Sequence, residues 1–126
     1  MRAVDTNVLV RILVRDEEKQ VASADAFVAK GVWVSPVVLA ETAWVLNDWY
    51  DLSHDIVAAA IEMLLNHETI SVHDAEVVAA ALGHYRRRPA LGFSDCLILE
   101  VARKAGHLPL GTFDQSLSKL EGTERL

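Results

Sequence analysis

Apolar and polar positions along the chain follow two patterns in turn, one typical of strands and one typical of helices. Short strand-like segments lie at residues 3–4, 32–34, 69–72 and 107–110. Between them, apolar residues recur at intervals of three and four positions, as on the buried side of a helix. Strands that alternate with helices form a parallel sheet with helices on both faces. The pattern therefore predicts an α/β protein.

Capping residues set the expected boundaries of the helices. A serine hydroxyl accepts hydrogen bonds from the free N–H groups of a first helical turn, and glycine readily adopts the left-handed conformation that ends a helix. Helices are expected to begin near residues 8, 16, 36, 54, 74 and 95, and the expected caps are Ser35, Ser53, Ser94, Gly31 and Gly106. A short helix near residues 116–120 and an edge strand in the last residues complete the pattern.

Composition and charge narrow the class of protein. A hydrophobic content of 52% excludes a disordered chain, and we expect one domain over residues 1–126. No apolar run approaches the roughly 20 residues of a membrane span and the N-terminus lacks a signal pattern, so we expect a cytoplasmic protein without membrane contact. The net charge of −6 argues against a protein that coats nucleic acid, so such contacts have to be local or carried by bound cations. Cys96, the one cysteine, is expected to be a buried small side chain.

Four acidic residues are expected at one edge of the sheet. In a β-α-β unit the N-terminus of the helix lies at the carboxyl ends of the strands, where ligands bind in open α/β sheets. Asp5 and Asp114 directly follow predicted strands, Glu41 lies in the second turn of the helix that begins after Ser35, and Asp95 begins another helix. We therefore expect these four carboxylates to converge.

Each acid also has a structural explanation. Asp5 could cap the helix that follows it, Asp95 could interact with a helix dipole, and Asp114 could form a turn. Glu41 is harder to explain in this way, because it stands among apolar residues with no Lys or Arg one helical turn away. Convergence of all four acids at one edge favours a binding site over four separate caps.

A cluster of carboxylates needs a cation. Two like charges about 4 Å apart repel by roughly 1 to 4 kcal/mol at water-like to surface-like dielectric. Oxygen ligands without His or Cys select hard ions, so Mg²⁺ or Mn²⁺ is expected and zinc is not. Because one divalent ion does not neutralise four carboxylates, a second ion, a shared proton or a nearby Arg or Lys is also needed.

Four segments carry a resemblance to a known family. They are Val4-Asp5-Thr6-Asn7, residues 35–41, Gly92-Phe93-Ser94-Asp95 and Thr112-Phe113-Asp114. In this order and at these spacings, they make nearly all of the chain resemble PIN-domain ribonucleases of the VapC toxin type. The resemblance implies a three-layer α/β/α fold around a central parallel sheet of four or five strands, a divalent-metal site and hydrolysis of single-stranded RNA regions. It also implies a homodimer and a cognate VapB-like antitoxin whose tail covers the active site.

The chemistry of such a site suggests a role for each residue. Asp5 and Asp95 would hold the metal ion with Asp114 as a third ligand, direct or through water, and Glu41 would orient or deprotonate the attacking water. The residues expected to fix these carboxylates are Thr6, Asn7, Ser94 and Thr112. The rival hypothesis is a non-catalytic PIN-like module that binds RNA or protein and keeps the acids for structure.

Basic and aromatic residues suggest contacts with partners. Arg11 and Arg15, one helical turn apart after Asp5, are candidates for binding RNA phosphates. One predicted helix is unusually rich in aromatic residues, with Trp44, Trp49 and Tyr50. Core packing accounts for some of them, and any that are exposed would indicate a dimer or antitoxin surface.

Two His-Asp pairs resemble the ligands of all-helical metal-dependent phosphohydrolases. His54-Asp55 and His73-Asp74 both stand at predicted helix starts, where aspartate is expected as a cap. No upstream His or distant Asp completes such a metal site, so we interpret both pairs as capping residues.

Overall fold

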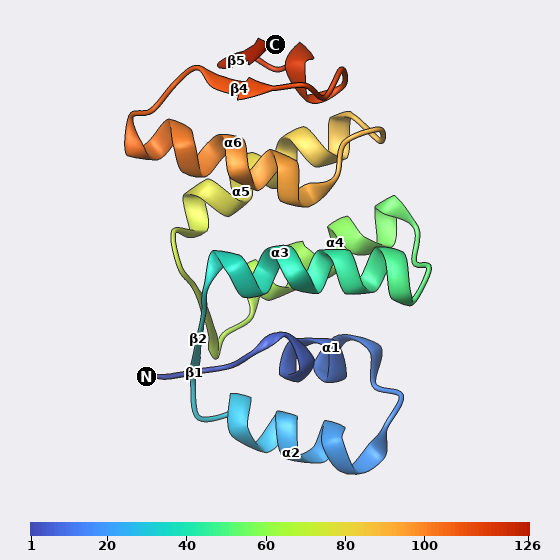
Figure 1. The fold of residues 1–126 in the computed structure, drawn as a ribbon. Coiled ribbons are helices and arrows are strands. Elements are labelled where there is room, and N and C mark those ends of the chain that lie inside the picture. Colours follow the sequence, from blue (N-terminus) through green and yellow to red (C-terminus); the bar gives the residue numbers. More distant parts are fainter.

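A computed structural model describes all 126 residues and has the predicted α/β architecture with parallel strands (Figure 1). The strands are β1 (Arg2–Ala3), β2 (Val32–Val34), β3 (Ile70–Val72), β4 (Leu110–Thr112) and β5 (Thr123–Arg125). The α-helices are α1 (Thr6–Val14), α2 (Glu18–Val28), α3 (Pro36–Trp44), α4 (His54–Asn66), α5 (Ala75–Arg87) and α6 (Phe93–Ala105). A π-helical turn, η1 (Val45–Trp49), and a 3₁₀ turn, η2 (Leu117–Lys119), complete the chain. None of the helices has the length and apolar character needed to span a membrane.

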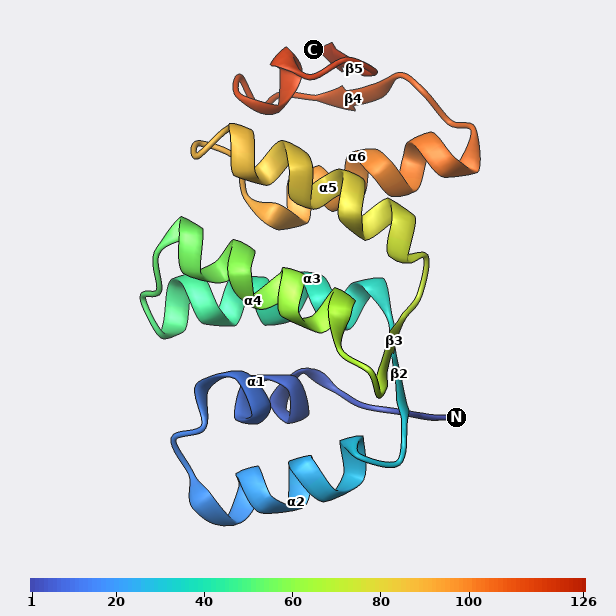
Figure 2. The same cartoon turned by 180° about the vertical axis from the view of Figure 1, so that it is seen from behind.

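The five strands form two parallel sheets rather than one. One sheet has the order β1-β2-β3, and the other pairs β4 with β5. Two opposite views show β4 and β5 beyond the α5-α6 pair, at the far end of the molecule from β1 (Figure 1, Figure 2). The strand expected at residues 107–110 begins only at Leu110, because Pro109 has no N–H group to donate to a ladder. Asp114 therefore follows a strand of the second sheet, and this changes the geometry of the acids.

Local capping chemistry explains most helix boundaries. The hydroxyl of Ser35 accepts a hydrogen bond from the amide of Val38 at 3.2 Å, and the hydroxyl of Ser53 caps α4 in the same way. Gly106 ends α6 in the left-handed conformation, as predicted. Ser94 is not a cap, because α6 begins two residues earlier than expected and Gly92 occupies the N-cap position.

Helix α3 lies at the centre of the hydrophobic core. It packs against α1 on one side and α6 on the other. Leu39 of α3 and Leu99 of α6 are 1% and 0% exposed, respectively. Cys96 is buried as predicted, and burial raises the pKa of its thiol to about 12. Since α3 carries Glu41 and α6 carries Asp95, the core contact between these helices also holds together the two elements that bear these acids.

Candidate functional site

The first pair of acids lies where α1 begins. Asp5 is the N-cap of α1, and its carboxylate accepts a hydrogen bond from the amide of Val8 at 3.3 Å. The next residue, Thr6, is buried and donates its hydroxyl hydrogen bond to Oε1 of Glu41 on α3. Because the N-terminus of a helix carries partial positive charge, it favours the two carboxylates gathered there. Asp5 therefore caps the helix, as one interpretation held, and also stands beside a second acid.

The second pair of acids joins the start of α6 to the segment after β4. Asp95 is partly buried in the first turn of α6, and this burial, together with the negative charge of Asp114, raises the pKa of its carboxyl group. Asp114 is exposed, and its carboxylate accepts hydrogen bonds from the amides of Ser116 at 2.8 Å and Leu117 at 3.2 Å. When the pKa of an acid is higher in the folded than in the unfolded protein, the free energy of unfolding falls as pH rises from the unfolded-state pKa to the folded-state pKa. At neutral pH the charge on Asp95 therefore opposes folding.

Two contacts connect the acids: Thr6, next to Asp5, donates to Glu41, and the charge of Asp114 acts on Asp95. No three His, Cys, Asp or Glu side chains lie close enough together to ligate one metal ion. The expectation of a single cluster placed every strand in one sheet, whereas β4 and Asp114 belong to the second sheet. The α3-α6 contact is what brings the helices of Glu41 and Asp95 next to each other.

The donor set of the second pair fits a divalent cation. Mg²⁺ in enzymes is commonly held by one or two carboxylates, with water and substrate phosphate as its other ligands. Asp95 and Asp114 supply oxygen donors only, and a cation between them would relieve the repulsion that raises the pKa of Asp95. Two carboxylates are therefore enough to hold a divalent cation, and a site of four acids is not required.

The four residues expected to fix the carboxylates make different contacts in the structure. Thr6 binds Glu41 directly, in agreement with the expectation. The hydroxyl of Thr112 accepts a hydrogen bond from the backbone amide of Asp114 at 3.0 Å, so it holds the backbone rather than the carboxylate. Asn7 is exposed in the first turn of α1, and Ser94 lies inside α6 without capping it.

Glu41 is exposed, whereas the sequence placed it among buried apolar residues. It shares one face of α3 with Val37 and Trp44, which are spaced four residues before it and three after it. Val37 and Trp44 are 77% and 57% exposed. Some of the apolar residues around Glu41 in the sequence thus lie on the surface. Because Glu41 is itself exposed, its charge needs no partner to offset a cost of burial.

The two arginines proposed for RNA binding contact acidic and polar groups of the protein itself. The Arg11 guanidinium donates to Tyr50 at 3.2 Å and to Gln20, and it lies 3.4 Å from a carboxylate oxygen of Asp16. Arg15 donates two hydrogen bonds to Asp25, at 2.7 and 3.1 Å. These contacts join α1 to the segment that follows it and, through Tyr50, to the end of η1. RNA phosphates would have to compete with them.

Neither His-Asp pair is explained by capping. Ser53 rather than Asp55 caps α4, and the side chain of Asp74 makes no cap hydrogen bond at the start of α5. Asp74 instead forms an ion pair with Lys104 of α6, 2.5 Å away. The capping interpretation is therefore wrong for Asp55, whereas Asp74 occupies the N-cap position of α5 without making a cap hydrogen bond. No third ligand near either pair completes a metal site.

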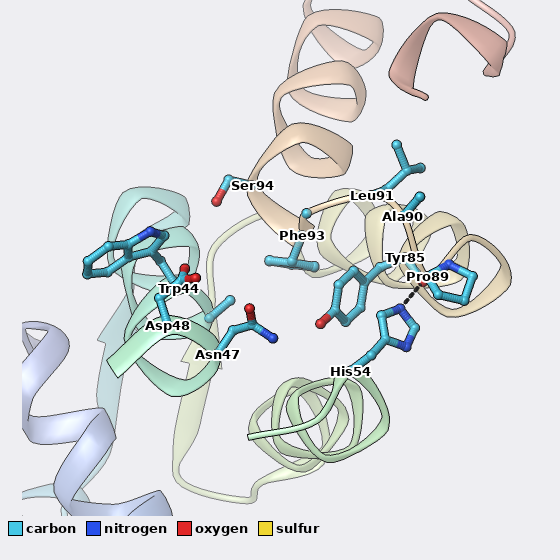
Figure 3. A pocket seen from close by; sticks show the side chains of 12 residues that line it. Trp44, Asn47, Asp48, His54, Tyr85, Pro89, Ala90, Leu91, Phe93 and Ser94 are labelled. Carbon is cyan, nitrogen blue, oxygen red and sulfur yellow. Dashed lines mark hydrogen bonds between the residues drawn. The ribbon is translucent and has the colours of Figure 1, made fainter. Parts of the chain in front are cut away.

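A cavity of about 260 Å³ lies next to the α3-α6 contact and was missed by reasoning from the sequence. It lies between η1, the start of α4, the end of α5 and the loop before α6 (Figure 3). Its walls include Trp44, Asn47, Asp48, Tyr85, Phe93 and Ser94. The number of aromatic residues near position 44 was the one local signal, because the other walls come from distant segments.

Comparisons with known proteins agree with this architecture. A family model described as PIN domain matches residues 2–122. Comparison with curated proteins and with solved structures found no match. PIN domains are typically metal-dependent nucleases, generally ribonucleases, and usually bind Mg²⁺ or Mn²⁺.

Proposed function

We propose that this chain, which belongs to the PIN domain family, is a Mg²⁺- or Mn²⁺-dependent endoribonuclease and the toxin of a toxin–antitoxin pair. The observation that carries the nuclease proposal is the carboxylate of Asp95. It is partly buried beside Asp114, and both effects raise its pKa. A charge that opposes folding is typical of a functional site, where stability is given up for activity.

In the proposed mechanism, Asp95 and Asp114 would hold the divalent ion directly, and Asp5 would contact it only through a water molecule. When bound, the ion polarises the phosphoryl group and makes water a stronger nucleophile. Glu41 receives a proton from the attacking water on Oε2, because Oε1 is already hydrogen-bonded to Thr6. The water oxygen bonds to phosphorus while the bond to the leaving oxygen of the RNA strand breaks.

The proposed antitoxin and homodimer rest on a different feature, the exposed apolar side chains near Glu41. Val37 and Trp44 lie on the same face of α3 as this acid, and Trp49 of η1 is 77% exposed. Exposed aromatic residues beside a polar site are typical of protein interfaces. We propose that the tail of a VapB-like antitoxin or a second copy of the chain covers this face.

The nuclease proposal is tested by incubating total cellular RNA with the antitoxin-free protein and Mg²⁺ or Mn²⁺. We expect discrete fragments that disappear with EDTA and with the Asp5→Asn variant. Asparagine caps helices as well as aspartate does, so the variant keeps α1 but loses the charge. Fragments that persist in both controls would refute a metal-dependent site at Asp5. A folded protein that neither cleaves RNA nor binds Mn²⁺ would favour the rival non-catalytic binding module.

Replacing Thr6 with valine is expected to slow RNA cleavage by about 10- to 100-fold, the usual effect of losing a group that orients a catalytic residue. Valine has a similar shape, so the buried position stays filled, but Glu41 loses its hydrogen-bond donor. Mn²⁺ affinity should remain unchanged, because Thr6 contacts the proposed base and not the proposed metal pair. Thr6→Ser, which restores the hydroxyl, should recover most of the rate. Equal rates for the valine variant and the parent would show that Thr6 does not position Glu41.

A further inference from the structure

The cavity next to the α3-α6 contact has no role in the mechanism proposed above. Trp44 and Asp48 border one side of it and Tyr85 the opposite side, with Asn47 between them (Figure 3). Trp44 lies one helical turn after Glu41, and Ser94 of the cavity wall directly precedes Asp95. A ligand in this cavity would therefore lie next to the proposed active site.

Tyr85 presents a hydroxyl group to the cavity without a partner in the protein. Its side chain is almost fully buried, with the residue only 4% exposed, and burial is the main cause of its raised pKa. The ring packs against His54 and Phe93, while the phenolic oxygen points toward Asn47 and the cavity (Figure 3). The hydroxyl is not sealed off from solvent, because no buried side-chain polar atom of the protein lacks a partner. It is therefore available to a ligand that enters the cavity.

The π-helical turn η1 supplies the other polar groups. Asn47 and Asp48 both lie in this turn, and π-helical turns inside helices are frequent at functional sites. The amide nitrogen of Asn47 donates to the backbone carbonyl of Leu52 at 3.2 Å, which fixes the side chain and leaves its oxygen as an acceptor. Asp48 contributes an exposed carboxylate. The lining of the cavity thus includes two acceptor groups, the Asn47 oxygen and the Asp48 carboxylate.

The chemistry of the walls selects the ligand. Exposed aromatic rings such as that of Trp44 stack on unpaired bases of single-stranded RNA. No Lys or Arg lines the cavity, so it is built for a base and not for a phosphate. An amide oxygen and a carboxylate together require adjacent donors on the ligand. Among the four RNA bases, only the Watson–Crick edge of guanine presents two neighbouring donor groups, N1–H and the 2-amino group.

We propose that this cavity binds a guanine base of the RNA strand and so selects the site of cleavage, an inference that rests on the proposed ribonuclease function. Asp48 and the Asn47 oxygen accept hydrogen bonds from the guanine edge. The Tyr85 hydroxyl donates to an acceptor of the same base, and Trp44 stacks on its ring.

The test is titration of the full chain with guanosine, adenosine, cytidine and uridine, followed by tryptophan fluorescence without divalent metal. Guanosine should quench the signal with an affinity at least tenfold above that of the other three. Trp44→Phe should remove most of this change, whereas Trp49→Phe, outside the cavity, should keep it. Asp48→Asn should weaken guanosine binding about tenfold, as expected for loss of a specific base contact. Asp51→Asn, an exposed loop residue outside the cavity, should leave it unchanged.

Nucleosides contain no phosphodiester bond, so this result does not depend on cleavage. Absence of binding at saturating guanosine, or equal affinity for all four nucleosides, would overturn the guanine site even if the protein cleaves RNA. Selective binding of guanosine by a chain that cleaves no RNA would keep the site and reject the nuclease. Tyr85→Phe gives a second measurement, because it removes only the free hydroxyl. It should weaken guanosine binding without lowering the free energy of unfolding, and unchanged binding would count against the proposal.

Discussion

The Asp95→Asn variant is expected to cleave RNA about a hundredfold or more slowly than the parent and to have a higher free energy of unfolding. The loss of activity follows because asparagine offers one neutral oxygen where the proposed ion needs a carboxylate. The gain in stability follows because burial and the charge of Asp114 raise the pKa of Asp95, so its ionised form opposes folding at neutral pH. Cleavage assays with Mn²⁺ and urea unfolding in the presence of EDTA measure the two effects separately.

Asp55 provides a matched control for this experiment. It lies in the first turn of α4, as Asp95 lies in the first turn of α6, but it is exposed. An acid in the first helical turn stabilises the folded state by about 0.3 to 1 kcal/mol through the helix dipole. Asp55→Asn should therefore lower the free energy of unfolding slightly and leave RNA cleavage unchanged. If Asp95→Asn keeps its activity and loses stability as Asp55→Asn does, Asp95 is only a helix-terminal acid.

Replacing Leu39 with alanine is expected to lower the free energy of unfolding by about 2 to 5 kcal/mol. Leu39 is 1% exposed and lies on α3, the helix that packs against both α1 and α6. Its truncation leaves a cavity at the contact that holds the helices of Glu41 and Asp95 together. Since single domains are stable by only about 5 to 15 kcal/mol, this is a large fraction of the total. Equilibrium unfolding in urea measures the loss.

Val37 on the opposite, exposed face of α3 is the control for Leu39. It is 77% exposed, so Val37→Ala should change the free energy of unfolding by no more than about 0.5 kcal/mol. Similar losses for the two variants would contradict the packing of α3 between α1 and α6.

Features set by local chemistry could be predicted from the sequence. Ser35, Ser53 and Gly106 cap helices through atoms only a few residues away, so their effect is visible in a short window of sequence. The α/β class follows from the alternation of segments, and Asp5 and Thr6 were recognised at the junction between a strand and a helix. Thr6 was expected to fix a carboxylate, and it donates to Glu41, although the sequence did not indicate which acid it contacts.

Features set by long-range packing could not be predicted. Which face of α3 is buried depends on α1 and α6, so the residues around Glu41 in the sequence do not indicate that it is exposed. Pairing of β4 with β5 rather than with β1 is a tertiary choice, and it places Asp114 after a strand of the second sheet. The cavity combines Tyr85 with residues from three other segments, and no single stretch of sequence contains its pattern.

Locating Mn²⁺ in crystals of the protein would test whether Asp95 and Asp114 hold a divalent ion for RNA cleavage. Anomalous scattering identifies the ion independently of activity. We expect a peak within ligand distance of carboxylate oxygens of both Asp95 and Asp114, and loss of that peak in Asp95→Asn crystals. A Mn²⁺ peak elsewhere, or none at a Mn²⁺ concentration that supports cleavage, would contradict this assignment.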